Sequence, residues 1–290
     1  MRGLTNPVNP RISFSEEKTM EIETLIATVD QEDYSLAEKM NIQTDAIIGN
    51  QCARNSENVI FWNNHKILYA NTTGRGVGKN RNLILSKANA DVCVLADDDM
   101  RFVDDYPKIV RQAFYECPDA DIIVFNLIEK QPKRYYNKKI KRIRWYNYAR
   151  YGAARLAICQ EKVKDANIEF SLLFGGGAKY GSGEDTVFLK ECLNKGLKIF
   201  AVPYAIAEID QDAASTWFHG YTKKFFADKG ALYACLYPRF WPLFAIRYLI
   251  KYQSKYKKEI STVHALQSVL GGGREFSAET KLEKNCRYGH

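Results

Sequence analysis

Two groups of carboxylates in the sequence have the spacing of a catalytic or metal-binding site. The first is the run Asp97, Asp98 and Asp99, which directly follows the apolar segment 91–96 (DVCVLA). Three neighbouring carboxylates repel one another, so a positive charge must compensate them. Oxygen-only ligands select Mg²⁺ or Mn²⁺, and these ions usually bridge carboxylates to substrate phosphates. The alternative is a solvated acidic turn before a helix that begins near Asp104.

The second group is Glu184 and Asp185. They follow a segment that contains five glycines, 175–183, and they open a helix predicted over 184–196. Acidic residues in a first helical turn can simply complement the helix dipole. The glycines favour a site, because a loop without side chains lets a substrate come close to the carboxylates.

The segment 74–82 (GRGVGKNRN) is glycine-rich but matches neither standard phosphate-binding motif. Only three residues separate Gly74 from the Gly78-Lys79 pair, and Asn80 stands where a P-loop has Ser or Thr. The segment still predicts the entry to a helix, and a helix N-terminus offers free N–H groups to an anion.

The elements that must position these residues alternate between short apolar strands and longer helices. This order predicts crossover connections and a mostly parallel sheet covered on both faces, hence an α/β fold. Open sheets of this kind bind ligands at the carboxyl ends of their strands, where Asp97 to Asp99 fall. The predicted strands are 23–29, 45–49, 59–62, 66–70, 91–96, 122–127 and 198–203, and the helices are 34–40, 79–88, 106–117 and 184–196.

The composition is that of a globular protein. Hydrophobic residues make up 46% and charged residues 26% of 290 residues, which excludes disordered and collagenous chains. Seven cysteines form no CxxC pair, which argues against thiolate metal sites and against a disulfide framework. We expect three regions: an extension over 1–19 with little order, an α/β domain over 20–230, and a basic amphipathic helical region over 231–290.

The excess positive charge lies at the C-terminal end. Residues 221–290 hold 13 Lys and Arg against 5 Asp and Glu. The most apolar stretch, 231–250, contains two prolines and two arginines, which argue against a membrane span. It predicts an interfacial segment at an anionic lipid surface, or alternatively a helical pair packed on the protein's own core.

Basic and aromatic residues alternate in the segment 130–150, which has nine Lys and Arg and no acid. Three interpretations stay open: a solvated loop, a site for an anionic acceptor or a membrane, and a single-stranded nucleic-acid site. No RNA-binding module is recognisable, and residues 1–220 have balanced charge, so we expect no nucleic-acid partner.

Taken in order, the segments ETLIATV (23–29), GVGKNRNLILSKANAD (76–91), LADDDM (95–100) and GSGEDTVFLKECL (181–193) resemble inverting family 2 glycosyltransferases of the GT-A fold. The resemblance covers about residues 21–230. It implies a catalytic base at Asp185 beside Glu184, and a Mn²⁺ or Mg²⁺ site at Asp99 and Asp97. It also implies a donor site at the ends of the first strands, formed by Ala27, Thr28, Val29, Asn50, Gln51, Arg81, Asp97 and Asp98.

The chain departs from the family in two places. Residues 47–52 (IIGNQC) replace the usual Asp-Asp-Gly, and the late His is absent from 207–217 (AEIDQDAASTW), where Glu208 or Asp210 are candidates to replace it. Trp217 is a candidate platform for an acceptor ring, or else an ordinary core tryptophan.

The segment 217–234 (WFHGYTKKFFADKGALYA) resembles, more loosely, bacterial members of the family that build capsule or exopolysaccharide. It implies transfer of a hexose from a nucleotide-diphosphate sugar, UDP-linked, to a saccharide acceptor carried on polyprenyl diphosphate. It also implies a cytoplasmic protein in peripheral contact with the inner membrane face. Two rivals remain: a sugar-1-phosphate nucleotidyltransferase, whose glycine-rich signature is missing after the first strand, and a non-enzymatic basic module that binds membrane or RNA.

Overall fold

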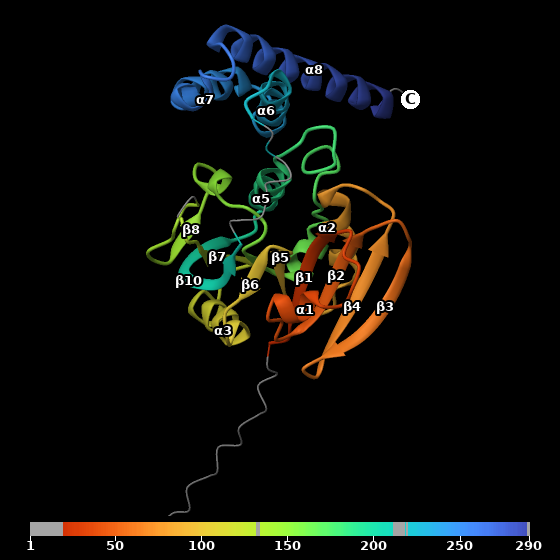
Figure 1. The fold of residues 1–290 in the computed structure, drawn as a ribbon. Coiled ribbons are helices and arrows are strands. Elements are labelled where there is room, and N and C mark those ends of the chain that lie inside the picture. Colours follow the sequence, from red (N-terminus) through yellow and green to blue (C-terminus); the bar gives the residue numbers. More distant parts are fainter. Residues whose placement is uncertain (1–19, 132–133, 211–217, 219, 289–290) are drawn as a thin grey trace, which may run out of the picture.

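The computed structural model describes residues 20–131, 134–210, 218 and 220–288, and among these it shows one large mixed sheet flanked by helices (Figure 1). The predicted extension 1–19 and Trp217 lie outside the described residues. The sheet order is β3-β4-β2-β1-β5-β9-β7-β10-β6, with β8 paired to β10. Neighbouring strands are parallel from β4 through β2 and β1 to β5, as expected for an α/β fold.

The strands are β1 (Ile22–Val29), β2 (Asp45–Gln51), β3 (Ser56–Trp62), β4 (His65–Thr72), β5 (Val92–Asp97), β6 (Met100–Phe102), β7 (Ile122–Ile128), β8 (Lys141–Ile143), β9 (Leu156–Cys159) and β10 (Ile199–Ile209). The helices are α1 (Leu36–Lys39), α2 (Val77–Lys87), α3 (Tyr106–Glu116), α4 (Gln160–Asp165), α5 (Glu184–Asn194), α6 (Lys223–Leu236), α7 (Trp241–Tyr256) and α8 (Thr262–Tyr288), with a 3₁₀ turn η1 at Tyr148–Arg150.

The sheet has a hydrophobic core on each face, because successive residues of its buried strands point to opposite sides. In β1, Ile26 joins the core that includes residues of α1 and α3. Its neighbour Leu25 joins the other core, with residues of α2, α4 and α5. The near-continuous apolar strands of the sequence are therefore explained by burial on both faces.

Each predicted strand and helix of residues 23–203 is present, with shifted ends. The paired strands 59–62 and 66–70 form the antiparallel hairpin β3–β4, and Asn63 and Asn64 turn it with φ of 46° and 67°. The helix predicted over 34–40 is shorter, since α1 covers only four residues. The short strands β6, β8 and β9 were not predicted, because three or four residues carry no periodic signal.

The C-terminal region is helical, as predicted, and it forms a third hydrophobic core. Helix α6 runs across residue 230, where the sequence placed a domain boundary. Helices α6 and α8 pack closely through glycines: a Cβ on Gly230 would lie 1.9 Å from the Val269 carbonyl oxygen, and one on Gly272 would lie 2.1 Å from that of Ala227. No described helix is long and apolar enough to cross a membrane.

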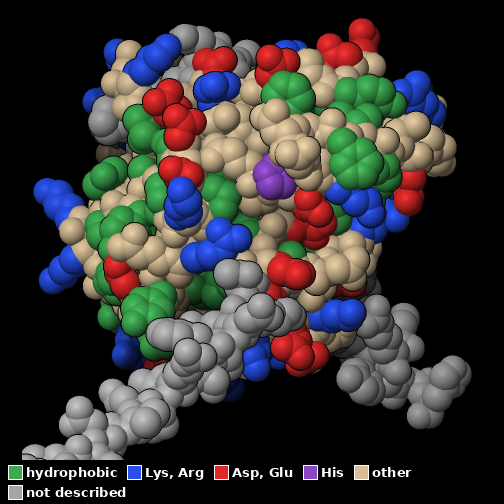
Figure 2. Space-filling model, turned by 90° about the horizontal axis from the view of Figure 1, so that it is seen from below, with side chains coloured by type: hydrophobic (Ala, Val, Ile, Leu, Met, Phe, Trp, Pro, Cys, Tyr) green, Lys and Arg blue, Asp and Glu red, His purple; other side chains and the backbone are tan. Residues whose placement is uncertain are grey.

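Helices α6, α7 and α8 lie together at the end of the molecule toward which β4 and its parallel neighbours point (Figure 1). The opposite end carries interspersed acidic, basic and hydrophobic side chains (Figure 2). The carboxyl edge of the sheet therefore faces the C-terminal helices.

Candidate functional site

Arg81 of α2 joins the two groups of carboxylates that the sequence singled out. Its Nη1 donates to Asp185 Oδ1 at 2.8 Å and to Glu184 Oε1 at 3.2 Å, while Nη2 donates to Asp97 Oδ1 at 2.8 Å. The guanidinium is buried and lies over the ring of Phe170, 5.3 Å from its centroid. Arg81 thus contacts carboxylates that are 16 and 104 positions away from it in the chain, and together they form one charged cluster.

Helix α2 is held against the strand ends by close backbone packing. Asn80 Nδ2 donates to the Gly49 carbonyl at 2.7 Å. A Cβ on Gly49 would lie 2.1 Å from Asn80 Oδ1, and a Cβ on Gly78 would lie 2.3 Å from the Ser171 carbonyl. Only glycine allows these two approaches, which fix the direction in which Arg81 points.

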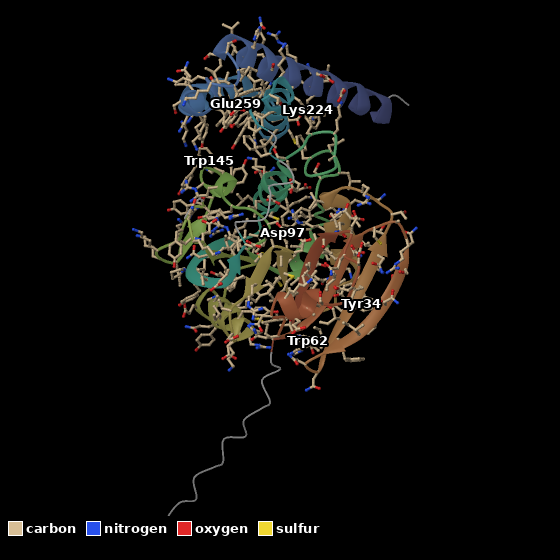
Figure 3. The ribbon with its side chains drawn as sticks, in the orientation of Figure 1. Tyr34, Trp62, Asp97, Trp145, Lys224 and Glu259 are labelled. Atoms are coloured by element: carbon tan, nitrogen blue, oxygen red, sulfur yellow. The ribbon has the colours of Figure 1, made fainter. Side chains whose placement is uncertain are left out.

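Most of the predicted donor-binding residues lie on three adjacent strands, while Arg81 is on α2 and Asp98 directly follows β5. The register pairs Ala27 with Asp97, and it pairs Thr28 with Asn50 and Val29 with Gln51. The Thr28 hydroxyl donates to Asp98 Oδ2 at 2.5 Å. The carboxyl ends of β1, β2 and β5 therefore form one edge, and Asp97 ends β5 there, on the side of the sheet toward the C-terminal helices (Figure 3). The predicted residues brought together here are Ala27, Thr28, Val29, Asn50, Gln51, Arg81, Asp97, Asp98, Glu184 and Asp185.

A polar network that the sequence did not predict supports this edge. Asn50 accepts from the Gln31 backbone N–H at 3.0 Å and donates to Asn71 at 2.8 Å. Gln51 Oε1 accepts from the Gly76 N–H at 2.7 Å, and Arg75 donates to the Gln51 carbonyl at 3.0 Å. Asn71 and Gln31 carried no signal, because single amides outside a motif are common in loops and strands.

Burial sets the electrostatics of the cluster. Desolvation raises the pKa of Glu184 to about 7, with repulsion from Asp185 adding to it and Arg81 acting against it. Desolvation also raises the pKa of Asp185 above its ordinary value, while the charge of Arg81 lowers it in part. Burial opposes the charge of Arg81, but its carboxylate neighbours more than offset this and raise its pKa. The site holds more negative than positive charge.

Asp99 is the carboxylate that best fits a cation. Burial, followed by repulsion from Asp97 and Asp98, raises its pKa to about 6. Its Oδ1 is buried without a hydrogen-bond partner. The described residues contain no group of three or more His, Cys, Asp or Glu that could hold a metal by themselves. One or two carboxylates are still enough for a Mg²⁺ ion that also binds substrate phosphates.

The glycine-rich loop before Glu184 approaches protein groups on both sides. Gly175 has φ of 110°, and a Cβ there would lie 2.6 Å from Val77 and 2.9 Å from Glu184. A Cβ on Gly183, with φ of 119°, would lie 2.6 Å from Leu232. The loop thus connects α2 and α5 with α6, and Gly181 N–H donates to Asp228 of α6 at 2.9 Å.

Other sequence candidates do not join this cluster. Trp217 lies outside the described residues. Asp210 contacts the aspartate run through its backbone, donating its N–H to the Asp99 carbonyl at 2.8 Å. In the basic segment 130–150, Lys141 and Arg150 lie over the ring of Tyr135, and Trp145 is 65% exposed. These contacts leave all three interpretations of the segment open.

Comparison with known proteins identifies the fold of this chain. No protein-family model matches the chain, and no curated protein is similar to it in sequence. Solved structures of S. aureus TarS are similar in three dimensions. TarS 1–349 with UDP-GlcNAc has a TM-score of 0.58 at 14% identity, covering 83% of this chain and 74% of that one. TarS 1–349 alone and with UDP each score 0.57, at 12% and 13% identity, covering 93% of this chain and 92% of that one.

TarS is a GT-A-type glycosyltransferase, and the likeness shows that this chain shares its fold. The expected α/β architecture is therefore confirmed: a mostly parallel sheet flanked by helices, with the fold of TarS. At 14% sequence identity, the structural likeness to TarS shows the fold alone, so the activity must be argued from the site.

Proposed function

We propose that this protein is an inverting glycosyltransferase of the family 2 type, which transfers a hexose from a UDP-linked donor to a saccharide acceptor. The observation that carries the proposal is the Arg81 cluster, which ties Asp97 at the end of β5 to Glu184 and Asp185 at the start of α5. The fold supports it, since TarS structures with this fold were solved with UDP and with UDP-GlcNAc.

The donor nucleotide would lie along the ends of β1 and β2, against Ala27 to Val29 and Asn50. Arg75 supplies positive charge at this edge, although it is itself paired with Asp30 at 3.2 Å. Mn²⁺ or Mg²⁺ would be held by Asp99 with Asp97, because the buried Asp99 Oδ1 has no other partner. Such an ion stabilises the charge that develops on a departing diphosphate.

Asp185 is the proposed general base. It removes the proton from an acceptor hydroxyl while that oxygen bonds to the anomeric carbon of the donor sugar. The bond between the anomeric carbon and the diphosphate oxygen breaks, and the electron pair leaves with the nucleoside diphosphate. A single displacement inverts configuration. The raised pKa of Asp185 suits a base that must accept a proton near neutral pH.

Arg81 and Glu184 are positioning residues in this scheme. The Arg81 guanidinium holds Asp185 Oδ1 at 2.8 Å, and a backbone hydrogen bond from Ala153 also orients this carboxylate. Glu184 shares the same Nη1 and also accepts from the Gly183 N–H at 3.1 Å. The base is therefore oriented by charge from one side and by the start of its own helix from the other.

We further propose peripheral contact with a membrane through α7, consistent with a cytoplasmic protein at the inner face of the cell membrane. Leu243, Ile246 and Ile250 are 65%, 41% and 74% exposed and fall on one helical stripe. Basic residues next to them suit anionic headgroups. The acceptor would then be a saccharide carried on a lipid diphosphate. Flotation with phosphatidylglycerol vesicles, and its loss in Leu243→Ser/Ile250→Ser, tests this contact.

Calorimetric titration with UDP, GDP and ADP, with and without Mn²⁺, tests the donor site. We expect metal-dependent binding of UDP, which Asp99→Asn abolishes. Absence of binding by all three nucleotides would contradict the proposed function. Incubation with UDP-hexoses, followed by proton NMR of the product's anomeric signal, then tests inversion.

A further inference from the structure

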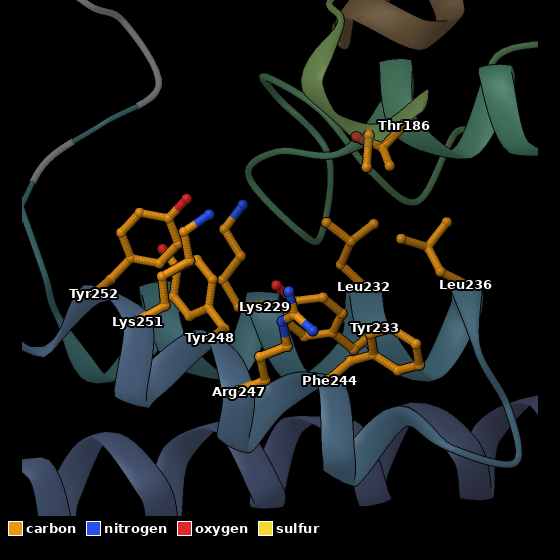
Figure 4. Close-up of a pocket in the computed structure, with 11 residues that line it drawn as sticks. Thr186, Lys229, Leu232, Tyr233, Leu236, Phe244, Arg247, Tyr248, Lys251 and Tyr252 are labelled. Carbon is orange, nitrogen blue, oxygen red and sulfur yellow. The ribbon is translucent and has the colours of Figure 1, made fainter. Parts of the chain in front are cut away.

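A basic, aromatic pocket of about 290 Å³ lies between α6, α7 and the start of α5 (Figure 4). Its polar lining contains three cationic side chains and three tyrosines and no acidic residue. Thr186, which directly follows Asp185, forms part of its wall. The cations and tyrosines are Lys229, Arg247, Lys251, Tyr233, Tyr248 and Tyr252.

The pattern along α7 explains why these side chains face the pocket. Phe244, Arg247, Tyr248, Lys251 and Tyr252 are spaced by three or four residues and lie on one stripe of the helix. A second stripe, which includes Ala245 and Leu249, is buried in the C-terminal core. The third stripe is the exposed apolar one that the membrane proposal uses. The pocket thus lies between the proposed membrane surface and the candidate base.

Lys229 connects the pocket with the Arg81 cluster. It is partly buried, and desolvation lowers the pKa of its ammonium group, while Asp228 and Glu184 act in the opposite direction. Its Nζ lies 3.4 Å from Ser182 Oγ, in the loop that leads to Glu184. The ammonium group also lies 5.5 Å from the centroid of the Phe225 ring. A cation held by a weak hydrogen bond and a ring contact can bind an anionic oxygen without first breaking a strong ion pair.

Rigid aromatic contacts shape the rest of the wall. Phe244 stacks on Tyr237 with ring centroids 3.9 Å apart, and Tyr248 contacts Tyr252 at 4.7 Å. Tyr237 is tied to η1 through a 3.0 Å hydrogen bond between its hydroxyl and that of Tyr148. These contacts join the C-terminal helices to the α/β part, so the pocket has walls from both.

We propose that this pocket binds a phosphate or diphosphate group of the acceptor, and so places the accepting sugar beside Asp185. The inference rests on the proposed function, because it identifies the acceptor side of the same reaction. Three cationic side chains and no acidic one favour an anion in this pocket. The flat aromatic faces suit the sugar or lipid carbon atoms next to that anion. A neutral saccharide would leave these three cations without a counter-charge, and Lys229 among them is already partly desolvated.

The test is calorimetric titration with three soluble probes: geranyl diphosphate, glucose 1-phosphate and uncharged geraniol. Each titration is run once with saturating UDP and Mn²⁺, which occupy the donor site, and once in EDTA. We expect wild-type protein to bind at least one phosphate probe and not geraniol. Arg247→Gln/Lys251→Gln should weaken that binding at least tenfold. The matched control Lys257→Gln/Lys258→Gln, exposed and outside the pocket, should change it less than twofold.

The outcomes separate the sources and the two proposals. Preference for geranyl diphosphate supports a lipid-linked acceptor, and preference for glucose 1-phosphate supports a soluble phosphosugar. Wild-type binding to neither, or equal weakening by both double variants, overturns the pocket assignment. UDP affinity should be unchanged in both double variants. If wild-type protein does not bind UDP, only the donor-site proposal is contradicted. Binding of the phosphate probes in EDTA is measured without UDP and tests the pocket separately.

Discussion

The strand-end site and the helical pocket are built in opposite ways. At the strand ends, charges are already paired: Arg81 has three carboxylate partners within 3.2 Å. In the pocket, Lys229, Arg247 and Lys251 line a cavity whose lining contains no acidic residue. A paired, buried cluster holds its geometry before substrate arrives, which suits a donor site and a base. An unpaired basic pocket depends on its ligand for compensation.

The first way to test this difference is to remove the proposed base. Asp185→Asn should lower turnover by about 10²- to 10⁴-fold, because an amide cannot take the acceptor proton. UDP binding should survive, since the Arg81 contact to Asp97 remains. Radiolabelled sugar transfer and calorimetry give the two readouts.

Glu191→Gln is the matched control, because Glu191 lies on the same helix and is not among the partners of Arg81. It should retain turnover within about twofold of wild type, because the half-buried Glu191 is not an ion-pair partner of Arg81 and a substitution away from such features changes stability by only about 0.5 kcal/mol. Full activity of Asp185→Asn would show that another residue is the base. The position of the pocket next to Thr186 would then no longer support its role in binding the acceptor.

The second test removes the central cation. Arg81→Met should lower the free energy of unfolding by about 3 to 5 kcal/mol, because it leaves buried carboxylates without their partner. Urea unfolding followed by circular dichroism measures the change. The loss should shrink as pH falls below 7 toward 4, because buried carboxylates with raised pKa values, such as Glu184 at about 7, then become neutral.

Arg75→Met is the control for charge removal at the same edge. Its ion pair with Asp30 joins side chains that are 52% and 63% exposed. Exposed pairs contribute about 0 to 1 kcal/mol, so this change should be small. Similar losses of unfolding free energy for Arg81→Met and Arg75→Met would show that the Arg81 cluster is not preorganised by its ion pairs.

The third test concerns how the helical region keeps its shape. Gly272→Ala should lower the free energy of unfolding by about 1 to 3 kcal/mol, because the new Cβ would overlap the Ala227 carbonyl of α6. Gly271→Ala is the matched control: its Cβ would meet nothing within 4 Å, and alanine favours a helix by about 0.5 to 1 kcal/mol. Differential scanning fluorimetry should move the two melting temperatures in opposite directions.

The two regions also differ in what the sequence could predict. The strand-end site was accessible because parallel strands end at one edge, so Thr28, Asn50 and Asp97 could be placed side by side from their positions after apolar runs. Glu184 and Asp185 were visible at a helix start. The pocket was not accessible, since Lys229 and Lys251 meet only through the way α6 and α7 pack, and no local pattern encodes that packing.

Some details of the strand-end site also depended on three-dimensional contacts. The bridge from Arg81 to Asp185 spans 104 residues and has no sequence period. Asn80 was seen only as a mismatch to the P-loop, yet it bonds the Gly49 carbonyl at the end of β2. Trp217, the predicted acceptor platform, lies outside the described residues and stays a prediction.

The smallest expected effect concerns Asp99. Its pKa of about 6 means that the folded, metal-free protein binds a proton more tightly than the unfolded chain, whose aspartate titrates near 3.9. Stability from this group is therefore present at low pH and is lost as pH rises through about 6. Asp99→Asn should stabilise the metal-free protein by about 1 kcal/mol at pH 7, after allowance for solvent screening, and by nothing below about pH 4.

Adding Mn²⁺ with UDP should reverse this order at pH 7, because wild type gains binding free energy that Asp99→Asn lacks. Thermal melts in EDTA and in Mn²⁺ with UDP, at pH 4 and pH 7, give all four comparisons. If Asp99→Asn destabilises the metal-free protein at pH 7, then Asp99 is compensated within the fold. The strand-end site would in that case be fully paired, and the cation would have to be placed elsewhere.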